Sequence, residues 1–304
     1  MKKIIVLLMV FGLLGSLLFA AGQAEAADDG KITIGMTVPG LQFPFFVTMM
    51  DEAKAYADEL GVELITHDSQ NQSSVQMSAV ENFIAQKVDG ILISPMTTDS
   101  LVPAIEAALA AGIPVATVDR KANTDKVLIH VGADNVEGGR AAARYIIEQL
   151  GNKGTVIQLE GTPGASAALD RKAGFDEVIN ASNVKVLVSQ EADFSRAKAQ
   201  SVMENLMQVY TDFDAVFGAN DEMIIGAIEA MDSAGVDPAS KVTIGFDATT
   251  DAFSYMEEGK LDATIDQFPG RQASRALDVL VGYIKNGTKP ANAVEYINPL
   301  PVTE

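Results

Sequence analysis

The stretch Ile113-Pro-Val-Ala-Thr-Val-Asp119-Arg120 decides the fold. A short β-branched run, opened by a proline and closed by an acid and a base, is typical of a buried parallel strand. Open α/β sheets bind ligands outside the carboxyl ends of their strands, where Asp119 and Arg120 stand. A carboxylate accepts hydrogen bonds and a guanidinium donates them in a planar fork, which suits a ligand rich in hydroxyl groups. A surface ion pair at a strand end is the alternative interpretation.

The rest of the chain from Lys31 onward alternates strand and helix in the same way. Strands are predicted at 32–38, 62–67, 89–94, 113–119, 127–131, 155–160, 184–189, 215–219, 242–247 and 263–266. Helices are predicted at 44–60, 73–87, 99–111, 136–150, 165–181, 194–210, 222–234, 250–258 and 270–285, and an extended tail follows. Such alternation favours parallel sheets covered by helices on both faces.

An internal sequence repeat divides this alternation of strands and helices into two halves. Asp89-Gly-Ile-Leu-Ile-Ser-Pro leads into a helix with Ala104-Ile-Glu-Ala, and Asp214-Ala-Val-Phe-Gly-Ala-Asn leads into one with Ala227-Ile-Glu-Ala. The sequence therefore predicts two doubly wound α/β lobes related by a pseudo-two-fold. Strand ends that face each other across two lobes make a cleft, which is a common place for a small ligand.

The N-terminus has the pattern of an export signal. Lys2 and Lys3 precede an apolar run at 4–21, and Ala24-Glu-Ala26 follows as a cleavage site. We expect a signal peptide at 1–26 and a mature, periplasmic protein that starts at Ala27. An uncleaved membrane anchor is the alternative, but glycines and a serine interrupt the run and a polar segment follows it.

Composition excludes several classes of partner and chemistry. Removal of residues 1–26 lowers Lys+Arg from 22 to 20 and Asp+Glu from 41 to 40, leaving a net charge of −20 over 278 residues. That acidity repels phosphate backbones, so we expect no nucleic-acid partner. The chain has no Cys, hence no disulfide, thiolate nucleophile or lipid-modified Cys at the signal junction.

The sequence offers no catalytic centre. His67 and His130 each stand at or near a strand end without a second ligand at metal spacing. No G-x-S-x-G, Walker A or G-x-G-x-x-G pattern is present, and Gly161-Thr-Pro-Gly164 is too short for a dinucleotide turn. We expect a protein that is not an enzyme, with no catalytic residues, no metal and no cofactor.

Candidate binding groups stand just after strands or on nearby helices. Planar polar groups come from Asp119, Arg120, Arg171, Asn220, Asp247 and Gln267, and flat aromatic faces from Phe45, Phe46 and Phe194. Each has a structural alternative: core packing for the aromatics, helix capping for Asn220 and Asp247, a solvated helix charge for Arg171. Together, the planar polar groups can make paired hydrogen bonds to vicinal hydroxyls, and the aromatic rings can pack against the C–H surfaces of a sugar ring. This combination indicates a sugar site.

The chain also resembles a known family, the periplasmic sugar-binding proteins of the type I fold, and among them especially the ribose-binding proteins. The resemblance runs from Lys31 to about Thr303. The motifs that carry it are Pro44-Phe-Phe-Val47, Asp68-Ser-Gln-Asn71, Asp119-Arg120, Asp134-Asn-Val136-x-Gly138-Gly139, Ala192-Asp-Phe194-x-Arg196, Asn220-Asp-Glu-Met223, Gly245-Phe-Asp247 and Ala263-Thr-Ile265-x-Gln267. The fold is shared by the sensor domains of sugar-responsive repressors.

The resemblance implies where a sugar would bind. In the family the residues that match Phe45, Phe46, Asp119, Arg120, Arg171, Phe194, Asn220, Asp247 and Gln267 line the pocket, and all nine residue types are kept here. Phe43 departs, because it stands where the ribose-binding pattern has an Asn that hydrogen-bonds the sugar. We expect a monosaccharide, namely ribose or another pentose, a deoxy sugar or a differently oriented hexose.

The resemblance further implies two doubly wound parallel-sheet lobes joined by a three-strand hinge. The N-terminal lobe is expected at 27–132 plus 268–296, and the C-terminal lobe at 133–267 plus 297–304. The resemblance also implies that the lobes close on the sugar and that the protein delivers the sugar to an ABC transporter permease. A monomer is expected. The alternative is a ligand presenter for a chemoreceptor or sensor kinase without a transport role.

Overall fold

The computed structural model describes residues 30–303, and the described residues from Ile32 onward form one compact unit. The signal peptide predicted at 1–26 lies outside the described residues. Within the described part, no helix is both apolar and long enough to cross a bilayer.

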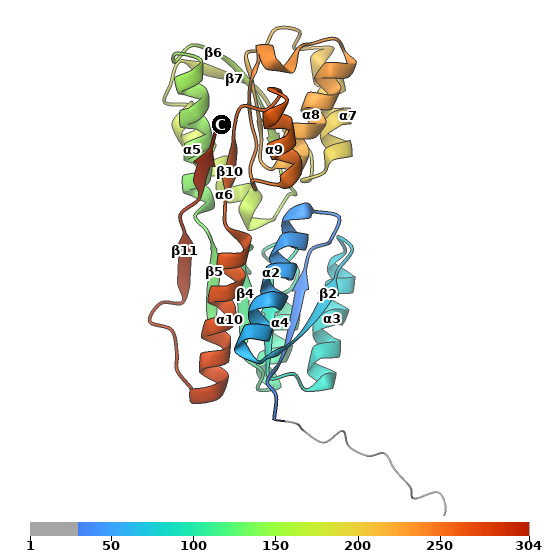
Figure 1. The fold of residues 1–304 in the computed structure, drawn as a ribbon, viewed down its shortest axis with the longest axis vertical. Coiled ribbons are helices and arrows are strands. Elements are labelled where there is room, and N and C mark those ends of the chain that lie inside the picture. The colour runs from blue at the N-terminus through green and yellow to red at the C-terminus, as the bar shows by residue number, and fades with distance from the viewer. Residues whose placement is uncertain (1–29, 304) are drawn as a thin grey trace, which may run out of the picture. The chain divides into compact units, whose positions relative to one another are not determined.

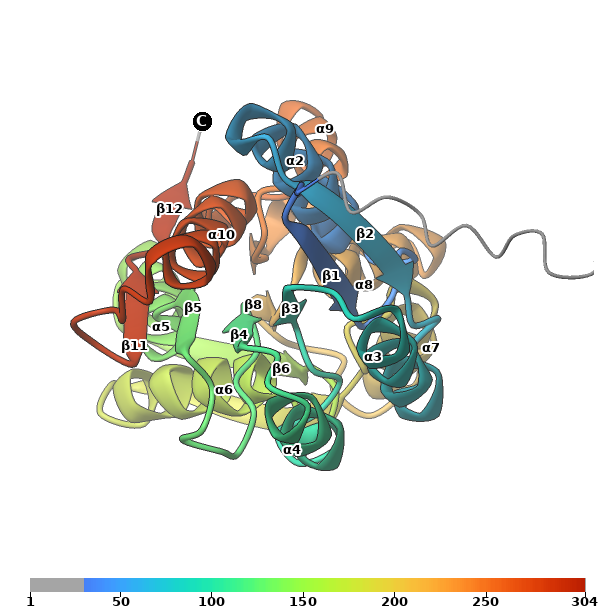
Figure 2. The same cartoon turned by 90° about the horizontal axis from the view of Figure 1, so that it is seen from below.

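The N-terminal lobe is built on a six-stranded sheet in the order β11-β5-β4-β3-β1-β2. All of its neighbouring strands are parallel. The strands are β1 Thr33–Val38, β2 Glu63–Asp68, β3 Gly90–Ile93, β4 Val115–Val118, β5 Ile129–Ala133 and β11 Val294–Ile297. Its helices are α2 Pro44–Leu60, α3 Ser73–Gln86, α4 Val102–Ala110 and α10 Pro269–Asn286. Helices α2 and α10 pack together on one face of the sheet, and α3 and α4 pack on the other (Figure 2).

The C-terminal lobe is built on a four-stranded parallel sheet in the order β7-β6-β8-β9. Its strands are β6 Gly154–Glu160, β7 Val184–Glu191, β8 Ala215–Gly218 and β9 Val242–Ile244. Its helices are α5 Asn135–Gln149, α6 Ser166–Ile179, α7 Arg196–Met207, α8 Asp221–Ser233 and α9 Thr250–Glu257, with a 3₁₀ turn η1 at Pro238–Ser240. The helices pack in pairs, α5 with α6 and α7 with α8, in the upper half of Figure 1.

Glycines allow the close approach of α5 and α6. A Cβ on Gly139 would lie 2.1 Å from the carbonyl oxygen of Arg171, and one on Gly174 would lie 1.9 Å from that of Val136. No side chain fits at such distances, so these backbones touch only because both positions are glycine. Phe175 of α6 stacks on Phe217 of β8 with ring centroids 4.5 Å apart, so α6 also packs against the sheet.

Three chain crossings join the lobes. They run from β5 to α5, from β10 (Thr264–Asp266) to α10, and from β11 to β12 (Leu300–Val302). Strands β10 and β12 pair antiparallel as a two-stranded sheet beside the C-terminal lobe. The predicted fold class, two doubly wound lobes joined by a three-strand hinge, is confirmed. The exact lobe limits given above stay a prediction.

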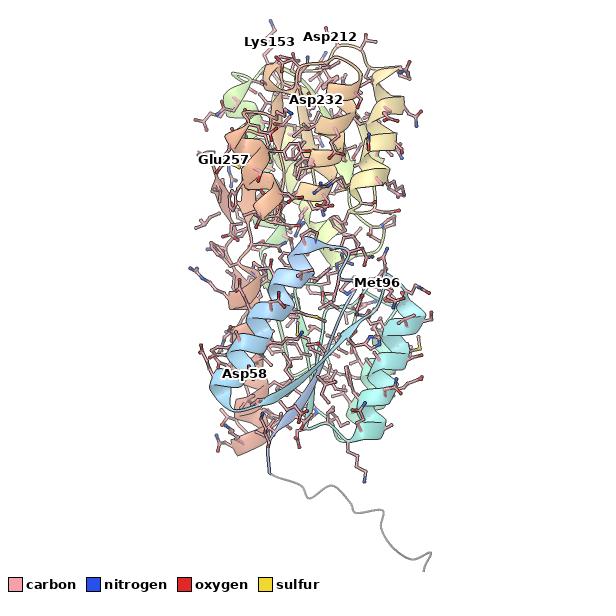
Figure 3. All side chains as sticks on the ribbon, turned by 45° about the vertical axis from the view of Figure 1, so that its right-hand side comes forward. Asp58, Met96, Lys153, Asp212, Asp232 and Glu257 are labelled. Atoms are coloured by element: carbon pink, nitrogen blue, oxygen red, sulfur yellow. The ribbon has the colours of Figure 1, made fainter. Side chains whose placement is uncertain are left out.

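The predicted elements are found within a few residues of their positions, with two differences. The predicted strand at 242–247 ends at Ile244, because the backbone turns away toward Asp247, which has a φ of 116°. The tail predicted only as extended contains β11 and β12, each of which pairs with a strand distant in the sequence. Charged side chains such as Lys153, Asp212 and Glu257 are exposed (Figure 3).

Candidate functional site

Every predicted site residue lines one cavity between the lobes, which we call the central cavity. Its lining is Phe43, Phe45, Phe46, Asp119, Arg120, Ala167, Arg171, Phe194, Asn220, Asp247 and Gln267. The empty volume inside it, including its opening, is about 300 Å³. A water-sized sphere can reach only about 20 Å³ of this space, so the lining side chains must move apart before a small ligand fits.

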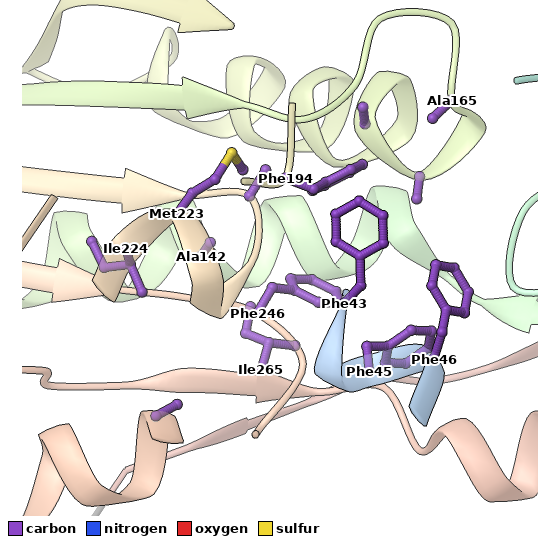
Figure 4. Close-up of a cluster of buried hydrophobic side chains, with 14 of the residues drawn as sticks. Phe43, Phe45, Phe46, Ala142, Ala165, Phe194, Met223, Ile224, Phe246 and Ile265 are labelled. Atoms are coloured by element: carbon purple, nitrogen blue, oxygen red, sulfur yellow. The ribbon is translucent and has the colours of Figure 1, made fainter. Parts of the chain in front are cut away.

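Three phenylalanines of the N-terminal lobe form an aromatic wall (Figure 4). Pro44 starts α2 with its fixed φ, which places Phe45 and Phe46 in the first turn and Phe43 at the N-cap. The Phe46 ring meets the edges of its neighbours, with centroids 5.1 Å from Phe45 and 6.2 Å from Phe43. All three side chains are buried and belong to the hydrophobic core. These phenylalanines therefore pack in the core and also line the central cavity.

The fourth aromatic side chain, Phe194, comes from the C-terminal lobe. Asp193 and Phe194 have φ values of 56° and 58°, a left-handed conformation that turns the chain after β7 into the cavity. Gly161 leaves space for the ring, because a Cβ there would lie 2.1 Å from Cζ of Phe194. The guanidinium groups of Arg120 and Arg171 lie 5.3 and 5.8 Å from the ring centroid.

Asp119 and Arg120 follow β4, as the strand prediction requires. Asp119 has a φ of 60°, and its Oδ2 accepts a hydrogen bond of 3.1 Å from the hydroxyl of Ser94. Arg120 donates from Nη1 to the carbonyl of Met96 at 3.0 Å, and its Nε has no hydrogen-bond partner. The two residues are 3% and 4% exposed, so the alternative of a surface ion pair is wrong. Burial lowers the pKa of Arg120 to about 10, so the guanidinium stays charged at neutral pH.

Arg171 projects from α6 into the central cavity and is 2% exposed. It donates from Nε to Oδ1 of Asn135 at 2.8 Å and from Nη1 to the carbonyl of Ala219 at 2.7 Å. Its guanidinium lies 3.7 Å from the ring centroid of Phe246. The alternative of a solvated helix charge is therefore wrong, because packing of α5 on α6 and β8 encloses the side chain.

Asp247 and Gln267 meet beside Arg171. Gln267 donates from Nε2 to Oδ1 of Asp247 at 2.6 Å, and Oε1 of Gln267 has no hydrogen-bond partner. Burial raises the pKa of the Asp247 carboxyl well above its usual value, although the charge of Arg171 opposes the shift. Asp247 does not cap α9; Thr249 does, accepting from the amide of Ala252 at 3.2 Å.

Asn220 has the capping role that the sequence allowed and also lines the cavity. Its Oδ1 accepts a hydrogen bond of 3.0 Å from the amide of Met223 at the start of α8. Its Nδ2 donates to the carbonyl of Phe194 at 3.3 Å. An amide Nδ2 carries two hydrogens, so one donor remains for a ligand.

Three residues that orient the cavity-lining side chains were not predicted from the sequence. Ser94 and Asn135 hold Asp119 and Arg171, as described above. Gln76 donates to the carbonyl of Ser94 at 2.8 Å and accepts from the amide of Met96 at 3.0 Å, so it fixes the turn that binds Arg120. A signal existed for Gln76, since it stands in the apolar stripe of α3 with Ala79, Val80 and Phe83.

The two histidines lie away from the central cavity lining. His130 in β5 is buried and bonded to Thr117, with Nδ1 3.1 Å from the hydroxyl. Burial, aided by the charge of Lys121, lowers the pKa of His130 to about 3, so the ring is neutral. Nδ1 of His67 is buried without a hydrogen-bond partner. Among residues 30–303, no group of three or more His, Cys, Asp or Glu side chains is arranged to hold a metal ion.

The sequence and the fold of the chain are similar to those of known proteins. A family model described as periplasmic binding protein domain matches residues 34–289. The ribose import binding protein of Bacillus subtilis (strain 168) is 42% identical over 261 residues, covering 85% of this chain and 84% of that protein. The galactofuranose-binding protein of Escherichia coli (strain K12) is 34% identical over 280 residues, covering 89% and 88%. Among solved structures, the binding protein of the arabinose ABC transporter from Shewanella sp. ANA-3, bound to α- and β-L-arabinofuranose, aligns with a TM-score of 0.85 and 32% identity, covering 89% of this chain and 91% of that one.

Proposed function

Since the chain belongs to the family of periplasmic binding proteins, we propose that it captures a monosaccharide in the central cavity and delivers it to an ABC transporter permease. Its relatives are binding proteins and not enzymes. One observation carries the proposal. Two of the four buried side-chain N and O atoms that lack a hydrogen-bond partner among the described residues, Nε of Arg120 and Oε1 of Gln267, belong to the cavity lining.

Buried polar atoms are costly unless they are hydrogen-bonded, so these atoms favour a ligand that bonds to both. A sugar hydroxyl both donates and accepts, and vicinal hydroxyls can pair with a guanidinium on one side and a carboxylate on the other. The phenylalanine faces suit the C–H surfaces of the ring. A few hydrogen bonds to charged groups, at about 1.5–3 kcal/mol each less the cost of closure, reach the ~8 kcal/mol of micromolar binding.

The proposed ligand class is a pentose or related monosaccharide. Relatives are named for ribose and galactofuranose, and a structural neighbour binds arabinofuranose. Phe43 selects among these sugars, because its apolar ring can neither donate nor accept a hydrogen bond where it lines the cavity. The preferred sugar therefore lacks a hydroxyl at Phe43 or points it elsewhere.

Delivery requires that the sugar can enter and leave. The lining comes from both lobes, so rotation about the three crossings would open the cavity. We place the lobes at 27–132 plus 268–296 and at 133–267 plus 297–304, with a signal peptide at 1–26 directing the protein to the periplasm. The lining residues named above are the proposed sugar contacts.

A thermal-shift screen of the purified protein against pentoses, hexoses and deoxy sugars tests the proposal. Binding to the folded state alone raises the midpoint of unfolding with ligand concentration. We expect one monosaccharide to stabilise the protein at micromolar concentration, with calorimetry giving one site per chain. If none of the sugars shifts the midpoint at millimolar concentration, the proposed ligand class is wrong.

Uptake of the radiolabelled sugar separates delivery from signalling. Deletion of the gene should abolish high-affinity uptake of that sugar, and expression of the chain should restore it. Unchanged uptake together with lost chemotaxis would favour the ligand presenter for a chemoreceptor instead.

A further inference from the structure

Among the described residues, three polar contacts join the lobes away from both the central cavity and the chain crossings. The amide of Lys121 donates to the hydroxyl of Ser166 at 2.8 Å, and Nζ of Lys121 lies 2.9 Å from Oδ2 of Asp170. The amide of Thr98 donates to the carbonyl of Gly164 at 2.9 Å. The partners in the C-terminal lobe all fall in residues 164–170, the start of α6 and the turn before it. Helix α6 also carries Arg171, so this region links the lobe contact to the ligand site.

Lys121 is the centre of these contacts. Besides Asp170, its ammonium contacts Tyr296 of β11, with the phenol oxygen at 3.2 Å and the ring centroid at 5.5 Å. Strand β11 leads directly into the third crossing between the lobes. Although burial lowers the pKa of Lys121, hydrogen bonds to Asp170 and Tyr296 raise it above its usual value, so the ammonium is charged at physiological pH.

None of the five residues in these lobe-to-lobe contacts lines the central cavity. Each contact joins residues of different lobes, so each exists only while the lobes are together. Interactions present in one of two states shift the population toward that state by their free energy. The contacts therefore favour the closed state without touching the ligand.

We propose that Lys121, with Asp170 and Ser166, forms a latch that sets the rate of ligand release. The proposal rests on the proposed function, because release presupposes a ligand bound between the lobes. A latch of this kind slows opening and leaves the chemistry of recognition unchanged. The ion pair is about one-third exposed, so each variant should change the release rate only modestly, by about two- to fivefold.

Stopped-flow release and calorimetry with the best sugar of the screen test the latch. Lys121→Met and Asp170→Ala should each raise the release rate about two- to fivefold, and the double variant should equal the single ones because both remove the same ion pair. The association rate and the unfolding midpoint of the sugar-free protein should not change. Lys121→Arg, which keeps the charge, should restore slow release.

The pair Lys126 and Glu106 is the matched control. Its atoms are 2.6 Å apart, and both residues lie in the N-terminal lobe, so closure does not alter the pair. Lys126→Met should leave release unchanged. If Lys121→Met releases sugar at the parent rate, or if Lys126→Met accelerates release as much, the latch is refuted while sugar binding stands.

A ligand-free measurement covers the case in which the parent protein binds no sugar of the screen. The chain has no Cys, so Glu81→Cys on α3 and Glu204→Cys on α7 accept spin labels selectively. Both positions are exposed, and both helices lie on the side away from β11 (Figures 1 and 2). The short-distance population should fall about two- to fivefold in Lys121→Met. An unchanged distance distribution overturns the latch, and absent binding by the parent overturns the proposed function separately.

Discussion

Nη1 of Arg171 lies 3.7 Å from Oδ1 of Asp247, an oxygen that also accepts the hydrogen bond of Gln267. The pair is buried, and Asn135 holds the opposite edge of the guanidinium. One carboxylate oxygen thus joins a residue of α6 to a residue at the second hinge crossing. Asn135 and Gln267 thus hold the side chains of Arg171 and Asp247 in place before a ligand binds. This pre-organisation lowers the entropic cost of binding.

This relationship predicts the effects of changes at Arg171. Arg171→Ala leaves Asp247 without its cation in a buried site, so we expect a loss of about 3–5 kcal/mol in the free energy of unfolding and no measurable sugar binding. Arg171→Lys keeps the charge but not the fork that reaches Asn135 and Ala219, so binding should weaken at least tenfold with a smaller loss of stability. Urea unfolding and calorimetry measure both quantities. A stability loss below about 1 kcal/mol in Arg171→Ala would match a solvated helix charge and contradict the structure.

A second prediction concerns the space behind Phe194. In Gly161→Ala, the new methyl group would lie 2.1 Å from Cζ of Phe194, so the ring must move toward the ligand or out of the wall. We expect calorimetry to show at least tenfold weaker binding. The control is Gly282→Ala in α10, where a Cβ meets nothing within 4 Å. That change should leave affinity unaltered and stabilise the helix by about 0.5–1 kcal/mol. Equal affinities of Gly161→Ala and the parent would show that Phe194 does not form the ligand wall.

A third prediction follows from the neutral, buried His130. Its pKa is about 3 in the folded protein, against about 6.5 in an unfolded chain. Between these values the unfolded chain binds a proton that the folded protein does not, so this contribution to stability is complete above about pH 6.5 and is lost as the pH falls toward 3. Relative to His130→Gln, the parent should lose about 2 kcal/mol of unfolding free energy between about pH 7.5 and pH 5. Urea unfolding at both pH values checks this. Parallel pH dependences of the two proteins would exclude His130 as the titrating group.

Local chemistry explains why most of the fold could be predicted from the sequence. Gly61 ends α2 in a left-handed conformation with a φ of 69°, and Pro44 starts that helix, as their positions in the sequence indicate. The lining residues could be located because carboxyl strand ends gather at one edge of a sheet. Residues 294–297 gave no such signal, since β11 is a strand only through its pairing with β5.

The burial of Arg171 also could not be predicted from the sequence. Small residues surround it along the chain and suggest an exposed helix face, but the glycine contact of α5 and α6 brings Asn135 against it. Likewise, Ser94 acts through a tertiary hydrogen bond to Asp119 that no spacing in the sequence reveals. Local pattern therefore located the residues that line the central cavity, whereas the residues that orient them required the structure.

The last prediction turns on Phe43, which is 6% exposed and forms part of the aromatic wall with Phe46. Sites that pair a hydroxyl strongly reject ligands that lack it, whereas apolar walls discriminate more weakly against an added hydroxyl. Phe43→Asn should therefore shift preference toward ribose by ~1–3 kcal/mol relative to the best sugar of the screen, the scale of one satisfied buried hydrogen bond against an unsatisfied one. Calorimetric titration of both proteins with both sugars measures the shift, and the ratio of the two affinities cancels any general loss of packing. If ribose is already the tightest ligand of the parent and the change only weakens it, Phe43 is a packing residue and does not select the sugar.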